Sequence, residues 1–175
     1  RGGGRGIAAP SANRFGNVSP TTAQAVADEL GAYLADGDQI LDGGPCDVGV
    51  ESTIIDCTGD VPKILRPGAI TAQMISDSTE LEVVGRASDG AVVDSNAIRV
   101  SGSLEAHYAP AATVVLDQSP VAGQGFIAMA DVAAGEGVVR LAAPKSHEEF
   151  ARVLYSALRT ADEQGLETVV VTQPV

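Results

Sequence analysis

The apolar positions of the chain predict a first α/β region over roughly its first 70 residues. Residues 6–9 form a short apolar run, which favours a buried strand that stops at Pro10. A loop follows, and Ser19-Pro20 has the composition of a helix start, with serine as the N-cap and proline in the first turn. The next apolar residues recur at helical spacing and predict one amphipathic face, made by Ala23, Val26, Ala27, Leu30 and Leu34.

Short strands are predicted after this helix. Residues 39–42 form a brief apolar run that enters a Gly-Gly-Pro turn, which favours a strand there. Residues 53–57 and 63–66 are two further strand-like runs. They are separated by residues 58–62, whose Gly, Asp and Pro are typical of a turn, so we expect an antiparallel hairpin.

The pattern weakens over residues 73–111, where polar and glycine-rich stretches favour a partly structured connector. A second regular region follows, with predicted strands at residues 113–116, 126–129, 137–141 and 168–172. Ser146 and Glu149 have the spacing of a capping box, and apolar residues at helical spacing from 150 to 161 predict a long helix that Gly165 ends. This order predicts a small three-layer α/β domain.

Composition and charge exclude several classes of protein. Hydrophobic residues make up 45% of the 175 residues, enough for a packed core built mainly from small aliphatic side chains. The net charge is −12, and residues 1–72, 73–111 and 112–175 are each net −4, so no basic module for nucleic acid is visible. No apolar run reaches the roughly 18 residues that a transmembrane helix needs. We therefore expect an acidic cytoplasmic protein.

The candidate chemistry is concentrated in the first region. Ser19 lies where a helix start could receive a phosphate, although the same residue is equally an ordinary N-cap. Arg66 ends a strand beside a glycine turn, where a guanidinium could bind a phosphate or simply pair with a local acid. Ser52 as a hydrolase nucleophile with His107 as base is disfavoured, because the G-x-S-x-G elbow is absent. Cys46 and Cys57 have no C-x-x-C spacing, and no metal site is predicted.

Considered together, four motifs resemble a known family. IAAPSANRFGNVSPTT (residues 7–22), ILDGGPCDVGVESTIID (40–56) and PKILRPGAIT (62–71) resemble the second half of the YrdC-like domain of threonylcarbamoyl-AMP synthases. LEAHYAP (104–110) resembles the HYAP segment of the long form of that family. In the long form a connector joins the YrdC-like domain to a small Rossmann-like domain. The resemblance implies a partial YrdC-like twisted α/β domain at residues 1–72, a connector at 73–111 and the Rossmann-like domain at 112–175.

The resemblance also implies an activity and a set of site residues. The family joins L-threonine, bicarbonate and ATP into threonylcarbamoyl-AMP and pyrophosphate, for the threonylcarbamoyl-transfer machinery that modifies tRNA. The nucleotide would be accompanied by Mg²⁺, and no residue would act as a covalent nucleophile. The motif positions imply ATP contacts for Ser11, Asn13, Ser19, Arg66 and Tyr108, and threonine contacts for Ala9 and Ser52.

The chain departs from the family at one motif. The Lys-x-Arg motif of the family's first half, which supplies positive charge for the triphosphate, does not occur in this sequence. We therefore expect the chain to begin inside the catalytic domain and to be inactive alone. Two alternatives stay open: a YrdC-like module that binds nucleotide or double-stranded RNA and tRNA without catalysis, and a carbamoyl-transferring relative from hydrogenase maturation. The HYAP segment favours the synthase over the latter.

Overall fold

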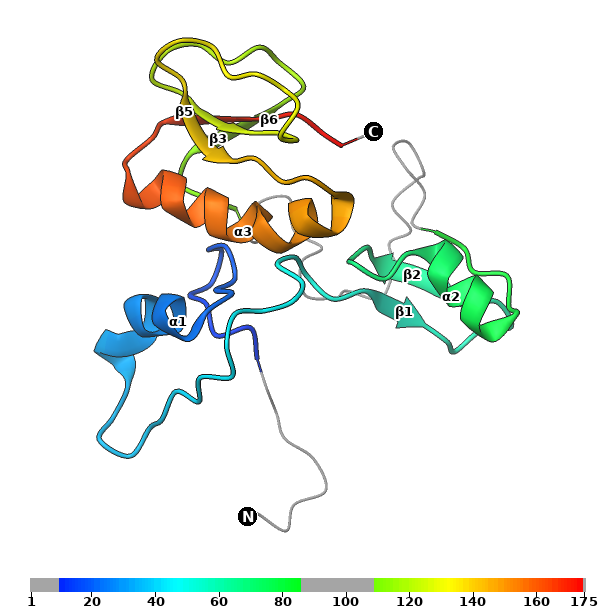
Figure 1. Cartoon of the computed structure of the whole chain (residues 1–175). Helices are drawn as coiled ribbons and strands as arrows, with labels where there is room; N and C mark the ends of the chain where they lie inside the picture. Colours follow the sequence, from blue (N-terminus) through cyan, green and yellow to red (C-terminus); the bar gives the residue numbers. More distant parts are fainter. Residues whose placement is uncertain (1–9, 86–108, 175) are drawn as a thin grey trace.

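A computed structural model describes residues 10–85 and 109–174 of the chain. The first part contains helix α1 (Ala23–Leu30), a 3-10 turn (Gly31–Tyr33), strands β1 (Ile54–Asp56) and β2 (Lys63–Arg66) and helix α2 (Ala72–Thr79). The second part contains β3 (Thr113–Leu116), β4 (Gly125–Ile127), β5 (Val139–Ala142), helix α3 (His147–Glu163) and β6 (Thr168–Val171). Figure 1 shows α3 between the sheet of the second part and the α1 region, with the β1–β2 hairpin and α2 to one side. The predicted strand at 6–9 lies outside the described residues.

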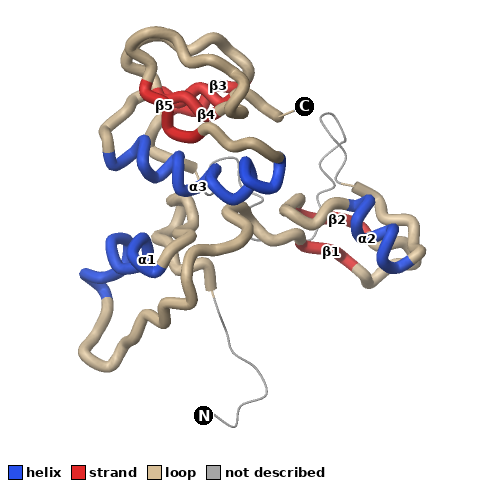
Figure 2. The backbone as a smooth tube through the Cα atoms, viewed as in Figure 1, coloured by secondary structure: helices blue, strands red, loops and turns tan. Residues whose placement is uncertain are grey.

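The second part is a parallel sheet with the strand order β3-β6-β4-β5. Helix α3 begins at Ser146, whose side chain accepts a hydrogen bond from the Glu149 amide, so the predicted cap is confirmed. Its apolar face packs on the sheet, which makes one layer of helix on one layer of strands among the described residues (Figure 2). The strands and the helix predicted in this region are confirmed to within a few residues.

Loops rather than a helix cover the second face of the described sheet. Phe126, Ala128 and Val170 are buried there. The Arg140 guanidinium lies 4.9 Å from the centre of the Phe126 ring and donates hydrogen bonds to backbone carbonyls of residues 128, 129, 132 and 142. Burial lowers the pKa of Arg140. One arginine therefore ties the loop after β4 over this face.

The first part confirms the hairpin and corrects two other predictions. β1 and β2 are antiparallel, as expected. The helix cap is Thr22, whose side chain accepts from the Ala25 amide, and not Ser19, which has a partner elsewhere in the fold. Residues 39–42 form no strand, because nothing in the described chain pairs with them. The predicted connector begins with helix α2, which Thr71 caps, so its first residues are regular.

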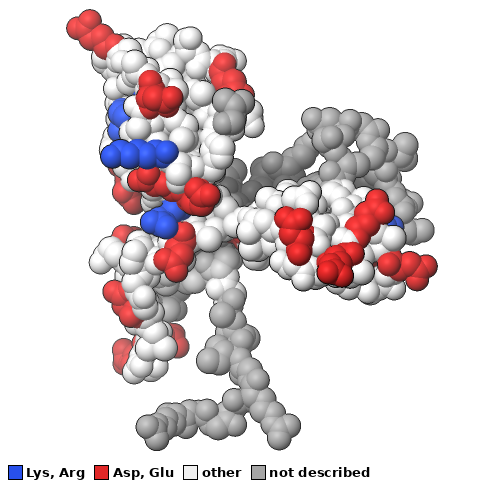
Figure 3. Space-filling model, turned by 45° about the vertical axis from the view of Figure 1, so that its right-hand side comes forward, with Lys and Arg blue, Asp and Glu red and all other residues white. Residues whose placement is uncertain are grey.

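The surface charge agrees with the acidic composition, and the helices agree with the expected lack of a transmembrane segment. Figure 3 shows acidic side chains scattered over the visible face and few basic ones. None of the helices in the described ranges combines the length and the apolarity that crossing a bilayer requires.

Candidate functional site

A cavity of about 610 Å³ gathers most of the predicted site residues. This volume lies within the range of about 300–1,000 Å³ that is usual for small-molecule sites. Ser11, Ser19, Ser52 and Arg66 line it, although they are far apart in the sequence. Most of the other lining residues are small or apolar. They are Pro10, Ala12, Pro20, Thr21, Val26, Cys46, Val48, Gly49, Val50 and Tyr155, together with the acidic Glu51.

Arg66 extends from the end of β2 onto the segment that precedes β1. Its Nε donates to the Ser52 carbonyl at 3.0 Å, and its Nη2 donates to the Ser52 hydroxyl at 2.8 Å. Nη2 also lies 3.5 Å from the Glu51 carboxylate. Arg66 is only 8% exposed, so these contacts hold its guanidinium in a defined place at the cavity wall.

Glu51 connects this arginine to Ser19. The Ser19 hydroxyl donates to Glu51 Oε1 at 2.6 Å, while Oε2 of the same carboxylate faces Arg66. Ser19 therefore does not cap α1, and its side chain points into the group of polar residues at the cavity. Of the described residues that line the cavity, Glu51 is the single acid and Arg66 the single base, so their charges balance.

Residues 11–19 form a loop that is organised by Asn13. The Asn13 side chain accepts a hydrogen bond from the Ser11 hydroxyl and donates to the carbonyls of Arg14 and Asn17. Asn13 does not line the cavity itself; it shapes the loop that carries Ser11. Between the two, Ala12 has a φ of 56°, a left-handed conformation that is uncommon for residues other than glycine.

Two glycines allow the backbone to close around the cavity. A Cβ on Gly68 would lie 2.4 Å from the Glu51 carbonyl oxygen and from the Thr53 nitrogen. A Cβ on Gly49 would lie 2.0 Å from the carbonyl oxygen of Arg152 in α3. The segment with Glu51 and Ser52 is thus packed directly on the turn after β2, and the preceding loop is packed directly on α3.

The second part of the molecule also contributes to the site. Tyr155 of α3 lines the cavity, and Arg152 of the same helix donates from Nε to the Asp47 carbonyl at 3.1 Å. Sequence reasoning missed Glu51 and Tyr155. Glu51 stands inside the quoted motif beside Ser52, which was a usable signal, whereas nothing local to residue 155 distinguishes it from an ordinary core position.

Two predicted site residues, Ala9 and Tyr108, lie outside the described residues, as does His107. The Ser52 hydroxyl accepts a hydrogen bond from Arg66, which does not provide the base that a serine nucleophile needs. Within residues 10–85 and 109–174, no cluster of three or more His, Cys, Asp and Glu side chains could hold a metal ion.

Comparison with known proteins links both parts of the chain to one family. The family model described as "Telomere recombination" matches residues 2–68, and the one described as "Threonylcarbamoyl-AMP synthase, C-terminal domain" matches residues 70–175. The chain is 34% identical to the threonylcarbamoyl-AMP synthase of Bacillus subtilis, over 94% of this chain and 51% of that protein. It is 32% identical to the enzyme of the same name from Pyrococcus abyssi, over 95% and 52% respectively.

A solved structure has the same fold. The crystal structure of Pyrococcus abyssi Sua5 complexed with L-threonine superposes with a TM-score of 0.67 at 30% identity, and covers 95% of this chain and 52% of its own. The chain thus spans about half the length of the relatives that it matches.

Proposed function

Since the chain belongs to the threonylcarbamoyl-AMP synthase family, we propose that it is part of an enzyme that makes threonylcarbamoyl-AMP and pyrophosphate from L-threonine, bicarbonate and ATP. The observation that carries the proposal is the cavity, where the motif residues Ser11, Ser19, Ser52 and Arg66 meet. The product would serve the machinery that modifies tRNA, and the enzyme would act in the cytoplasm.

The reaction has two steps. The amine of threonine attacks bicarbonate and gives a carbamate with loss of water. A carbamate oxygen then attacks the α-phosphorus of ATP, the bond from this phosphorus to the bridging oxygen breaks, and pyrophosphate leaves with the electron pair. Such a transfer depends mainly on positioning and on stabilisation of the phosphate charge.

The residues of the cavity fit these steps. We assign Ser52 to the threonine substrate and Arg66, which holds Ser52, to the phosphate at which the carbamate attacks. Ser11 and Ser19 would contact the nucleotide through their hydroxyl groups, with Asn13 fixing the position of Ser11. The cavity wall formed by Val48, Val50 and Tyr155 is apolar and would limit access of water to the labile intermediates.

We expect Mg²⁺ to enter the site as part of the nucleotide substrate. Mg²⁺ usually binds through one or two carboxylates together with phosphates and water. Glu51 is the carboxylate among the described residues that line the cavity, and Ser19 and Arg66 engage its two oxygens, so the ion would enter the site on the phosphates of ATP. Bound to ATP, the ion would offset phosphate charge, which the balanced pair of Glu51 and Arg66 does not do by itself.

We include Ala9 and Tyr108 in the proposed site because they stand in the motifs that resemble the family. Ala9 would contact threonine, and Tyr108 of the HYAP segment would cover the nucleotide. If Tyr108 acts in this way, the Tyr108→Ala variant should weaken ATP binding and raise the ratio of ATP consumed to adenylate formed. A lower melting temperature with unchanged affinity and coupling would instead mark residues 104–110 as a plain tether.

The experiment that tests the function is pyrophosphate release by the full-length protein that contains this chain. We expect release only when ATP, threonine and bicarbonate are all present. Equal release without threonine would refute the proposal. Carbamoyl phosphate as the required substrate would indicate the hydrogenase-maturation relative, and a salt-dependent shift of tRNA without turnover would indicate an RNA-binding module.

A further inference from the structure

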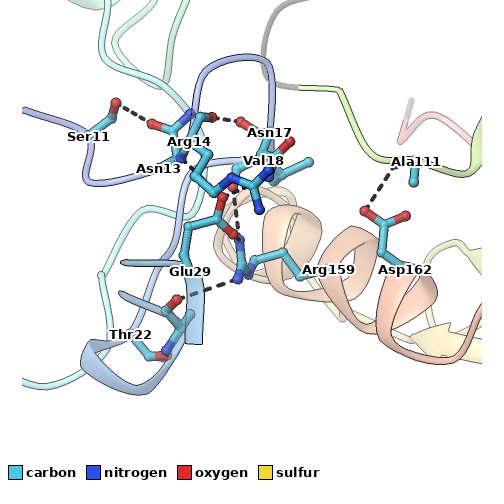
Figure 4. A network of polar contacts seen from close by, with 11 residues as sticks. Ser11, Asn13, Arg14, Asn17, Val18, Thr22, Glu29, Ala111, Arg159 and Asp162 are labelled. Carbon is cyan, nitrogen blue, oxygen red and sulfur yellow. Dashed lines mark hydrogen bonds and ion pairs between the residues drawn. The ribbon is translucent and has the colours of Figure 1, made fainter. Parts of the chain in front are cut away.

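Glu29 of α1 joins the loop of residues 11–19 to helix α3 of the second part. Its Oε1 accepts hydrogen bonds from the Arg14 amide at 3.0 Å and from Asn17 Nδ2 at 2.7 Å. Its Oε2 lies 3.2 Å from Arg159 Nη1 (Figure 4). The side chains of Glu29 and Arg159 are 9% and 14% exposed, so little solvent screens the pair.

Arg159 also contacts the loop and α1 directly. Its Nη1 donates to the Val18 carbonyl at 3.1 Å, and its Nη2 donates to the Ala25 carbonyl at 3.4 Å. Val18 itself is 2% exposed and belongs to the buried cluster that contains Ala157 and Leu158 of α3. The loop is therefore held by α3 through polar and apolar contacts that span about 140 residues of sequence.

A continuous series of hydrogen bonds leads from this contact to the cavity. Glu29 holds the side chain of Asn17, the carbonyl of Asn17 accepts from Asn13, and Asn13 accepts from the Ser11 hydroxyl. The other end of the loop supplies Ser19 to the cavity. Tyr155, four residues before Arg159 and hence one turn away on the same face of α3, forms part of the cavity wall.

We propose that Arg159 is a positioning residue: from the second part of the molecule it fixes the 11–19 loop through Glu29 and so sets the affinity for ATP. This inference rests on the proposed function, since it assigns the loop to the nucleotide. It adds that α3, a helix of the second part, is required for the shape of the nucleotide site. A purely structural Arg159 would affect stability without favouring one substrate over another.

The kinetic test uses Arg159→Gln, Arg159→Lys and Glu29→Gln in the full-length protein. Arg159→Gln should raise the KM for ATP about tenfold, which lies within the usual range of affinity changes between two coupled sites. The KM for threonine should stay within about twofold of the wild-type value. Arg159→Lys should recover most of the loss, because an ammonium can still pair with Glu29. Glu29→Gln should resemble Arg159→Gln, and the double variant should be no worse than either single one.

Asp162→Asn is the matched control. Asp162 lies on the same helix, but it accepts its hydrogen bonds from the amides of Ala111 and Ala112 and not from the 11–19 loop. This variant should leave the KM for ATP unchanged. An Arg159→Gln enzyme with a lower melting temperature and the same KM for ATP as the wild type would overturn the proposal.

Hydrogen exchange on the chain described here tests the loop independently of turnover. Arg159→Gln should accelerate exchange of the amides of residues 14–18 about tenfold, while exchange in β6 stays unchanged. Equal protection of these amides in the variant and the wild type would also overturn the proposal. A wild-type protein without threonine-dependent pyrophosphate release would refute the proposed function, and the exchange result would still decide whether Arg159 positions the loop.

Discussion

Glu51 and Ser52 fix the position of the Arg66 guanidinium at the cavity wall. The guanidinium is held by the carbonyl and hydroxyl of Ser52 and by the Glu51 carboxylate, at distances of 2.8–3.5 Å. A phosphate that binds Arg66 would approach a preformed cation whose side-chain entropy is already lost. Ser19 donates to the same carboxylate, so the group responds as a unit to the loss of any member.

Arg66→Ala should raise the KM for ATP about tenfold to a hundredfold, as expected for loss of a charge-assisted hydrogen bond of about 1.5–3 kcal/mol. The KM for threonine should change much less. The melting temperature should also decrease, because Glu51, with a side chain 16% exposed, would lose its cation. Compared with Arg66→Ala, Arg66→Lys should recover more of the melting temperature than of the ATP affinity, since lysine has the positive charge but not the planar guanidinium. Unchanged nucleotide kinetics in Arg66→Ala would mean that Arg66 only maintains the fold.

The Glu29 carboxyl makes the stability of the α1–α3 contact dependent on pH. Burial alone would raise the pKa of Glu29, but hydrogen bonds from Arg14 and Asn17, together with Arg159, hold the pKa below its ordinary value of 4.5. A lowered pKa in the folded state stabilises the protein above the ordinary value, and this stabilisation is lost as the pH falls through the lowered pKa.

Wild type and Glu29→Gln should therefore differ in melting temperature at neutral pH and converge as the pH falls below 4.5. Melting curves of both proteins between neutral and acid pH measure this. The difference between the two proteins removes the contribution of other carboxyls that titrate in the same range. A difference that is constant over the whole series would show that Glu29 acts through its shape and not through its charge.

Sequence patterns correctly predicted the elements that have clear turn or cap residues or a continuous apolar face. The hairpin, the four strands of the second part and α3 all have regular apolar spacing and clear turn or cap residues. The failures are elements decided by tertiary partners. Ser19 has the chemistry of a cap but donates to Glu51, and residues 39–42 have the apolarity of a strand but no neighbour to pair with.

The candidate site was predictable only through its motifs. Ser11, Ser19, Ser52 and Arg66 were assigned together by resemblance, and the fold places them in one cavity, although their roles remain predictions. Tyr155 and Arg159 could not be found in this way, because their contacts come from the face of α3 that meets the first part. A helical period identifies which residues face the sheet, but it does not identify which residues face a second partner.

The Gly68→Ala variant tests how closely the turn after β2 must approach the segment that contains Glu51 and Ser52. Gly68→Ala should destabilise the protein by about 1–3 kcal/mol, because the added Cβ meets backbone atoms that no rotamer change can move. It should also raise the KM for threonine, since Ser52 would be displaced. Gly59→Ala in the same hairpin is the control, because a Cβ there would meet nothing within 4 Å. Equal melting temperatures for both variants would mean that the turn yields without affecting the site.

On the scale of the whole molecule, α3 packs against both parts. One face of this helix packs on the parallel sheet, and its other side contacts the loops whose residues line the cavity. The buried cluster on the sheet includes Val18 from the 11–19 loop, so the two parts share a core. A change that separates them should therefore alter both stability and the shape of the site.

Gly49 is the position where this separation can be imposed with one methyl group. A Cβ on Gly49 would lie 2.0 Å from the Arg152 carbonyl oxygen in α3, so Gly49→Ala must move a helix backbone or the loop itself. We expect a loss of about 1–3 kcal/mol in the free energy of unfolding. We also expect a higher KM for ATP, because Val48, Val50 and Tyr155 would no longer close the same wall. Gly43→Ala, in the same loop with nothing within 4 Å of an added Cβ, should change neither quantity. Melting curves and steady-state kinetics of the two variants measure both effects. If Gly49→Ala lowers the melting temperature but leaves the KM for ATP at the wild-type value, the two parts are joined for stability alone and α3 does not shape the nucleotide site.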